Sequence, residues 1–97
     1  MNSAEQKDYE HATPSDEEVQ EIISVVRFKL DKLKPDNQEI KSGYEAAVDI
    51  LKKQIKNPEH IPPHLTANKS KAIAILAVNY LNGECSREVL LGFGLPD

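Results

Sequence analysis

A ten-residue apolar run from Ala72 to Leu81 constrains this chain more than any other feature of its sequence. Nine of the ten residues are apolar, and only Asn79 interrupts them. The run is too short to cross a bilayer, which needs about 20 residues. A helix that is apolar around most of its circumference must be covered on several sides by its own chain or by a partner. The sequence therefore predicts a helix at the centre of a small core.

Two amphipathic segments precede this run and predict a pair of helices. The first extends from Asp16 to Lys34 and begins with a capping-box pattern at Ser15. The second extends from Asn37 to Lys56. Their apolar residues recur at helical spacing, and the short link through Pro35 forces antiparallel neighbours. Antiparallel packing is expected to bring the acidic side chains of 17–21 beside the basic side chains of 52–56.

A proline-rich connection, residues 57–65, separates this pair from the apolar helix, which Thr66 or Asn68 is expected to cap. Ser86 is expected to cap a last short helix that ends near Leu91. The predicted fold is all-α: a small bundle of three main helices plus a short fourth C-terminal helix. Residues 15–97 are predicted to form this single helical domain.

The N-terminal segment, residues 1–14, is predicted to be a disordered acidic tail because it is polar and lacks apolar periodicity. Residues 1–18 contain one basic and six acidic side chains, a balance of −5. The whole chain has a net charge of −4, so residues 19–97 carry a balance of +1. Neither part has the clustered positive charge typical of nucleic-acid binding.

The sequence offers little for catalysis, metals or cofactors. One cysteine, Cys85, cannot form an internal disulfide, and with His60 and His64 it lacks any known metal-ligand spacing. No nucleophile motif or glycine-rich phosphate loop is present. We therefore expect a protein that is not an enzyme, binds no cofactor or metal, has no role in a membrane and is cytoplasmic.

Two sets of residues are candidates for binding. Val25 and Phe28 lie off the apolar stripe of the first helix, and Phe93 and Leu95 follow the last one, so these four are the candidate partner-binding residues. They are predicted to contact another protein or a second copy of the chain in a homodimer; closure of the monomer's own core is the alternative. Two further residues, Lys69 and Lys71, lie at a predicted helix N-terminus and are candidates for anion binding.

The stretch from Gly83 to Pro96 resembles the turn and second helix of helix-turn-helix DNA-binding domains, which often read G-x-S-x-x-E-[IV]-A-x-x-L-G-[IV]-[SP]. The matching residues are Gly83, Glu88, Val89, Gly94, Leu95 and Pro96, whereas Cys85, Leu90 and Phe93 replace the usual Ser, Ala and Leu. The resemblance implies a DNA-binding regulator. In that family a further helix enters the major groove, and this sequence stops at Asp97, so we expect the pattern to pack a short helix onto the apolar one.

From these observations the sequence favours a non-catalytic protein-protein interaction or regulatory protein that presents an apolar helical surface. A helix-turn-helix-like DNA-binding regulator is the alternative. Bacterial immunity-type helical proteins share this size and helix content, without a shared motif. Binding that weakens as salt rises would indicate DNA, whereas binding that survives high salt would indicate a protein partner.

Overall fold

The computed structural model describes residues 13–34 and 37–93. In these ranges the chain forms four α-helices and one short 3-10 helix, with no strand, which confirms the predicted all-α fold. The elements are α2 (Asp16–Leu30), α3 (Gln38–Lys53), the 3-10 helix (Pro58–His60), α4 (Asn68–Leu81) and α5 (Arg87–Gly92).

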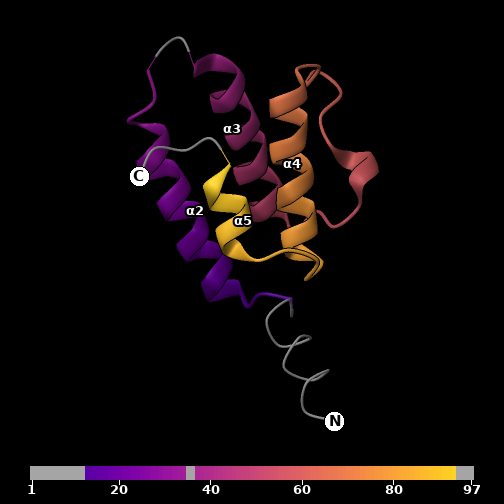
Figure 1. The fold of residues 1–97 in the computed structure, drawn as a ribbon. Coiled ribbons are helices and arrows are strands. Elements are labelled where there is room, and N and C mark those ends of the chain that lie inside the picture. Colours follow the sequence, from indigo (N-terminus) through magenta and orange to yellow (C-terminus); the bar gives the residue numbers. More distant parts are fainter. Residues whose placement is uncertain (1–12, 35–36, 94–97) are drawn as a thin grey trace.

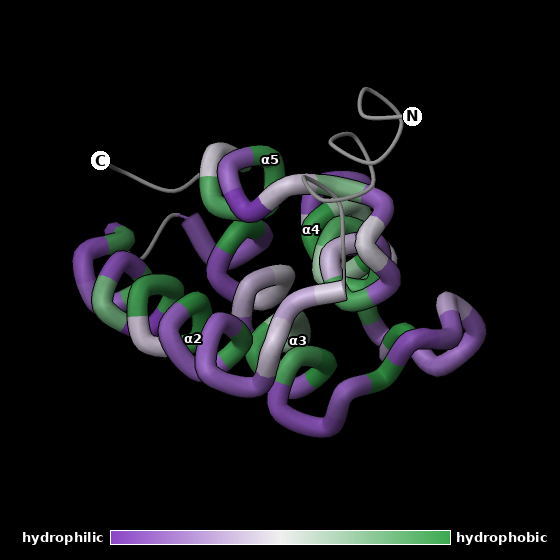
Figure 2. The backbone as a smooth tube through the Cα atoms, turned by 90° about the horizontal axis from the view of Figure 1, so that it is seen from below, coloured by the Kyte–Doolittle hydropathy of each residue, from purple (hydrophilic) through white to green (hydrophobic). Residues whose placement is uncertain are grey.

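The four helices surround one core (Figure 1). α3 runs antiparallel to α2 and lies between it and α4, while the short α5 lies over the gap between α2 and α4. Viewed from the end of the bundle, α5 and α3 lie on opposite sides of the core (Figure 2). The predicted disordered tail falls almost entirely on residues 1–12, which lie outside the described residues.

The apolar helix α4 is covered on most sides, as its sequence requires. Six of its apolar side chains are buried, and among its large ones only Ile75, which is 40 % exposed, reaches solvent freely. α4 approaches α3 closely at Gly43, where an added Cβ would lie 2.9 Å from the Cα of Ser70. A glycine inside a helix costs about 1 kcal/mol relative to alanine, and this close approach of two backbones explains why glycine occupies the position.

Two helices end earlier than the sequence predicts. α2 ends at Leu30 rather than Lys34, because the amides of Lys32 and Leu33 bond to carbonyls three residues back and tighten the last turn. α3 ends at Lys53 rather than Lys56. Gln54 adopts a left-handed conformation with φ 56°, and the Ile55 amide bonds to the Ile50 carbonyl at 3.0 Å in a Schellman-type ending.

Two helix caps agree with the prediction from the sequence, and the cap of α4 differs from it. The hydroxyls of Ser15 and Ser86 accept from the amides of Glu18 and Val89, as predicted. α4 is preceded by Ala67, which provides no side-chain cap, so neither Thr66 nor Asn68 plays the predicted role. A carboxylate from α3 caps the helix instead, as described below.

The predicted ion pairs between α2 and α3 are absent from residues 13–34 and 37–93. Glu21 pairs with Arg87 of α5 at 3.5 Å, and Lys53 pairs with Asp49 of its own helix at 3.3 Å. Long side chains on an exposed helix surface gain little from any one partner. The opposite charges of residues 17–21 and 52–56 therefore did not determine which side chains form ion pairs.

Candidate functional site

A buried tyrosine fixes α5 to the bundle. The hydroxyl of Tyr44, on α3, reaches across the core and lies 2.7 Å from the carbonyl oxygens of both Leu90 and Phe93. Burial raises the pKa of Tyr44 to about 12, and the bond to Phe93 opposes part of that rise. Leu90 is itself fully buried. The backbone at the end of α5 is therefore held beside the core, and this position in turn places the Phe93 side chain at the surface.

Large apolar side chains are exposed mainly on α2 and at α5. In the part of the chain that the structure describes, they are Phe28 at 63 %, Val89 at 50 %, Ile75 at 40 % and Phe93 at 37 % exposed. All except Ile75 belong to α2 or to α5 and its C-cap; α5 lies over the gap beside α2 (Figure 1), and the Glu21–Arg87 ion pair joins the two helices.

The predicted partner-binding residues are not equally exposed. Phe28 is the most exposed large apolar residue of the described chain, Phe93 is more than one-third exposed, and Val25 is half-buried. Leu95 lies outside the described residues. The first two present apolar surface to solvent, which is the property that a binding role requires, whereas Val25 keeps only part of its side chain accessible.

Helical spacing places Val25 and Phe28 on one side of α2. They follow Glu21 by four and seven residues, so the three side chains form one stripe. Because Glu21 contacts Arg87, this stripe lies on the side of α2 nearer to α5. Lys32 extends it, and its ammonium group lies 4.3 Å from the centroid of the Phe28 ring in a cation–π contact. We call Glu21, Val25, Phe28 and Lys32 the α2 stripe.

Val89 does not join this stripe. It follows Arg87 by two residues, which is about 200° around an α-helix. Arg87 reaches toward α2, so Val89 points away from α2. The exposed apolar residues of α2 and α5 therefore lie on neighbouring helices without forming one continuous face.

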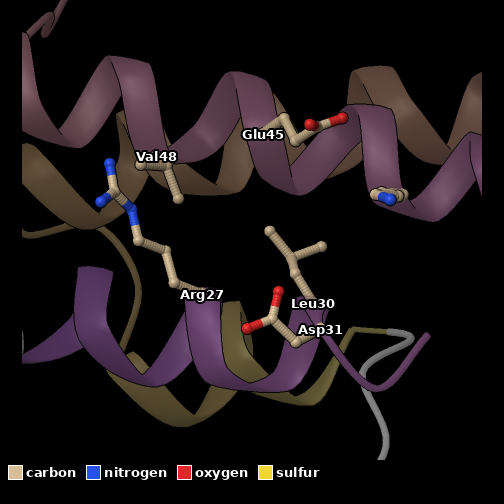
Figure 3. Close-up of a pocket in the computed structure, with 6 residues that line it drawn as sticks. Arg27, Leu30, Asp31, Glu45 and Val48 are labelled. Carbon is tan, nitrogen blue, oxygen red and sulfur yellow. The ribbon is translucent and has the colours of Figure 1, made fainter.

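A hollow of about 420 Å³ opens on the other side of α2, between that helix and α3. Leu30 and Val48 form its apolar floor, and both are more than nine-tenths buried. Four charged residues surround this floor (Figure 3). They are Arg27, Asp31, Lys41 and Glu45. We call these six residues the α2–α3 hollow.

Sequence reasoning did not identify this hollow. The sequence does contain two pairs of opposite charges, each spaced by four residues. One pair, Arg27 and Asp31, lies at α2, and the other, Lys41 and Glu45, lies on α3. Such pairs are ordinary on helix surfaces and stabilise a helix by themselves. Only the packing of α2 on α3 shows that the two pairs line the same depression.

The N-terminus of α4 already holds an anionic group from the chain itself. A carboxylate oxygen of Glu39, on α3, accepts from the Lys69 amide at 3.1 Å, and the Ser70 hydroxyl donates to the Glu39 carbonyl at 2.6 Å. The side chains of Lys69 and Lys71 are exposed. An external anion would compete with Glu39 for the Lys69 amide, and the anion-binding role of the two lysines stays a prediction.

Two side chains near the α4–α5 turn are of interest for chemistry. Burial raises the pKa of the Cys85 thiol, which donates to the Leu76 carbonyl at 3.5 Å, so the thiol is held in its protonated form at neutral pH. The Tyr80 hydroxyl is buried and has no hydrogen-bond partner among the residues that the structure describes. In residues 13–34 and 37–93 no group of three potential metal ligands occurs, and no helix is both long and apolar enough to cross a membrane.

The described part of the segment that resembles a helix-turn-helix, residues 83–93, comprises the turn after α4 and the helix α5, and its remaining residues lie outside the described ranges. Gly83 adopts φ 73°, a conformation that favours glycine, and Leu90 packs into the core. No protein-family model matches this sequence, and neither a curated protein nor a solved structure shows significant similarity to it.

Proposed function

We propose that this protein is a non-catalytic interaction or regulatory protein that binds another protein through the apolar part of the α2 stripe. The single observation that carries the proposal is the 63 % exposure of Phe28, a large aromatic side chain in the last turn of α2. Burial of an aromatic side chain contributes much of the energy of protein interfaces. The proposal includes a cytoplasmic location.

The surroundings of Phe28 suit a contact surface. Val25 adds a half-buried apolar side chain one turn earlier, and Glu21 and Lys32 bound the stripe with opposite charges. A small apolar centre with a charged rim is typical of protein interfaces. Phe93 lies at the end of the neighbouring helix and adds a second exposed aromatic side chain within the same region of the molecule.

A pull-down with matched variants tests the proposal. Wild-type protein, Phe28→Ser and Ile75→Ser are immobilised and exposed to an extract of the source cells at about 1 M salt, where charges are screened beyond about 3 Å. Ile75 is a suitable control because it is also exposed but lies on α4, across the bundle from α2.

We expect a protein that is retained by wild type and Ile75→Ser and lost from Phe28→Ser, with all three variants folded by circular dichroism. Retention that is independent of Phe28, or lost equally in both variants, would contradict the proposal. The DNA-binding alternative gives a different result: a duplex shifted in a gel at low salt and released as salt rises.

A further inference from the structure

We propose that the α2–α3 hollow binds one helix of a different protein, whose facing stripe carries an acidic, a basic and an acidic side chain in that order. This inference goes beyond the proposed function, because the hollow opens on the other side of α2 from the α2 stripe. It depends on three properties of the hollow: an apolar floor, charges without partners, and their order along the groove.

The charges around the floor are available for a ligand. Arg27, Asp31 and Glu45 are exposed, and Lys41 is half-buried. In the part of the chain that the structure describes, none of the four forms an ion pair within 4 Å or a side-chain hydrogen bond. Two positive and two negative side chains therefore surround Leu30 and Val48 without satisfying one another.

Helix geometry gives the order of these charges. Arg27 and Val48 lie beside each other at one end of the hollow, and Asp31 and Glu45 lie further along it (Figure 3). With a rise of about 1.5 Å per residue, Asp31 is about 6 Å beyond Arg27. On the antiparallel α3, Glu45 is about 4.5 Å and Lys41 about 10.5 Å beyond Val48. The order is positive, then two negative side chains at nearly one level, then positive.

A helix matches this spacing. Residues i, i+4 and i+7 lie on one side of a helix and differ in height by about 6 and 10.5 Å. An acidic residue at i can meet Arg27, a basic residue at i+4 can meet Asp31 and Glu45, and an acidic residue at i+7 can meet Lys41. A leucine or isoleucine at i+3 would cover the floor. This arrangement is a helix-in-groove contact with charge complementarity.

The occupant differs from the helices of this chain. No helix within residues 13–34 and 37–93 carries an acidic, a basic and an acidic residue at i, i+4 and i+7. A second copy of the chain therefore lacks the required stripe in its described helices. The occupant contacts α2 on the side away from the α2 stripe, so it adds a second contact surface to the one that Phe28 provides.

Two synthetic peptides test the inference. Both are blocked, alanine-based helices; the first carries Glu, Leu, Lys and Glu at i, i+3, i+4 and i+7, and the second carries Lys, Leu, Glu and Lys there. Binding is followed by fluorescence anisotropy and by amide shifts in the nuclear magnetic resonance spectrum. We expect the first peptide to shift amides of residues 27–31 and 41–48 and to bind about tenfold more tightly than the second.

Inverting the charges of the hollow should reverse this preference. The variant contains Arg27→Glu, Asp31→Lys, Lys41→Glu and Glu45→Lys, which leaves the net charge unchanged and breaks no ion pair of the structure. Its control inverts the exposed pair of α3 by Asp49→Lys and Lys53→Glu, and should keep the wild-type preference. Melting temperatures establish that both variants are folded.

Four results with the peptides would overturn the inference. They are equal binding of the two peptides, amide shifts outside the hollow, no change of preference in the inverted variant, and displacement of the peptide by free zwitterionic amino acids at similar concentration. Dimerisation that the inverted variant abolishes would identify a second copy as the occupant and would overturn it too. Failure here is distinguishable from failure of the proposed function, because the Phe28-dependent pull-down does not use these peptides.

Discussion

Replacing Gly43 by alanine should destabilise this protein, although the same change stabilises most helices. Alanine in place of glycine within a helix contributes about 1 kcal/mol. At this position, however, the new methyl group would lie 2.9 Å from the Ser70 Cα and 2.9 Å from Cδ1 of Ile73. The isoleucine can change its rotamer, whereas the Ser70 backbone can retreat only if α4 moves away from α3.

The cost of moving α4 away from α3 decides whether Gly43→Ala lowers or raises the free energy of unfolding. Overpacking in a close-packed core costs about 1 to 3 kcal/mol, and separating the helices also stretches the 2.6 Å bond from the Ser70 hydroxyl to the Glu39 carbonyl. We expect a net loss of up to about 2 kcal/mol after the helical gain of about 1 kcal/mol is subtracted, and the stretched hydrogen bond adds to that loss. For a domain of this size, a loss of about 2 kcal/mol lowers the melting temperature by about 8–16 °C.

Urea unfolding followed by circular dichroism measures this change, and Gly92→Ala is its matched control. Gly92 also lies in a helix, yet an added Cβ there meets no atom of the described residues within 4 Å, so this variant should be as stable as wild type or more stable by up to about 1 kcal/mol. If Gly43→Ala proves as stable as Gly92→Ala, the close approach of α3 and α4 does not have the energetic effect inferred here.

Two further predictions concern buried hydroxyl groups. Tyr44→Phe removes the donor to two carbonyl groups and should cost about 1 to 3 kcal/mol in urea unfolding. Folding raises the pKa of Tyr44 from 10 to about 12. The stabilisation that the neutral Tyr44 hydroxyl provides is therefore complete below pH 10 and is lost as pH rises through 12. Wild type should lose more stability over that range than Tyr44→Phe, and equal losses would refute this role. Tyr80→Phe removes a buried hydroxyl that has no partner within the described ranges and should raise the melting temperature, whereas a fall would show that the hydroxyl forms a hydrogen bond in solution.

The elements that depend on local pattern were predictable from the sequence. Apolar residues at helical spacing identified α2 and α3, and the capping residues Ser15 and Ser86 located the start of two helices. The apolar run from Ala72 to Leu81 identified the helix that the others cover. These features are encoded in neighbouring residues, so no knowledge of the packing was needed to find them.

The features that depend on contacts between distant residues were not predictable in the same way. Glu39 caps a helix that begins 29 residues later, and Tyr44 holds α5 from across the core. The exposure of Phe28 could be suspected from its place off the apolar stripe, but the α2–α3 hollow could not. Its two charge pairs come from separate helices, and each pair alone is ordinary.

By itself, the sequence determined that this chain forms helices and which side of α2 and of α3 becomes buried, because both follow from residue types within one or two turns. Only the tertiary structure decided how the helices meet. Gly43 allows α4 to approach α3, the separation of α2 and α3 leaves a charged hollow, and a hydroxyl on α3 sets the position of α5. Those outcomes arise from volumes and distances between segments far apart in the chain, which no local pattern specifies.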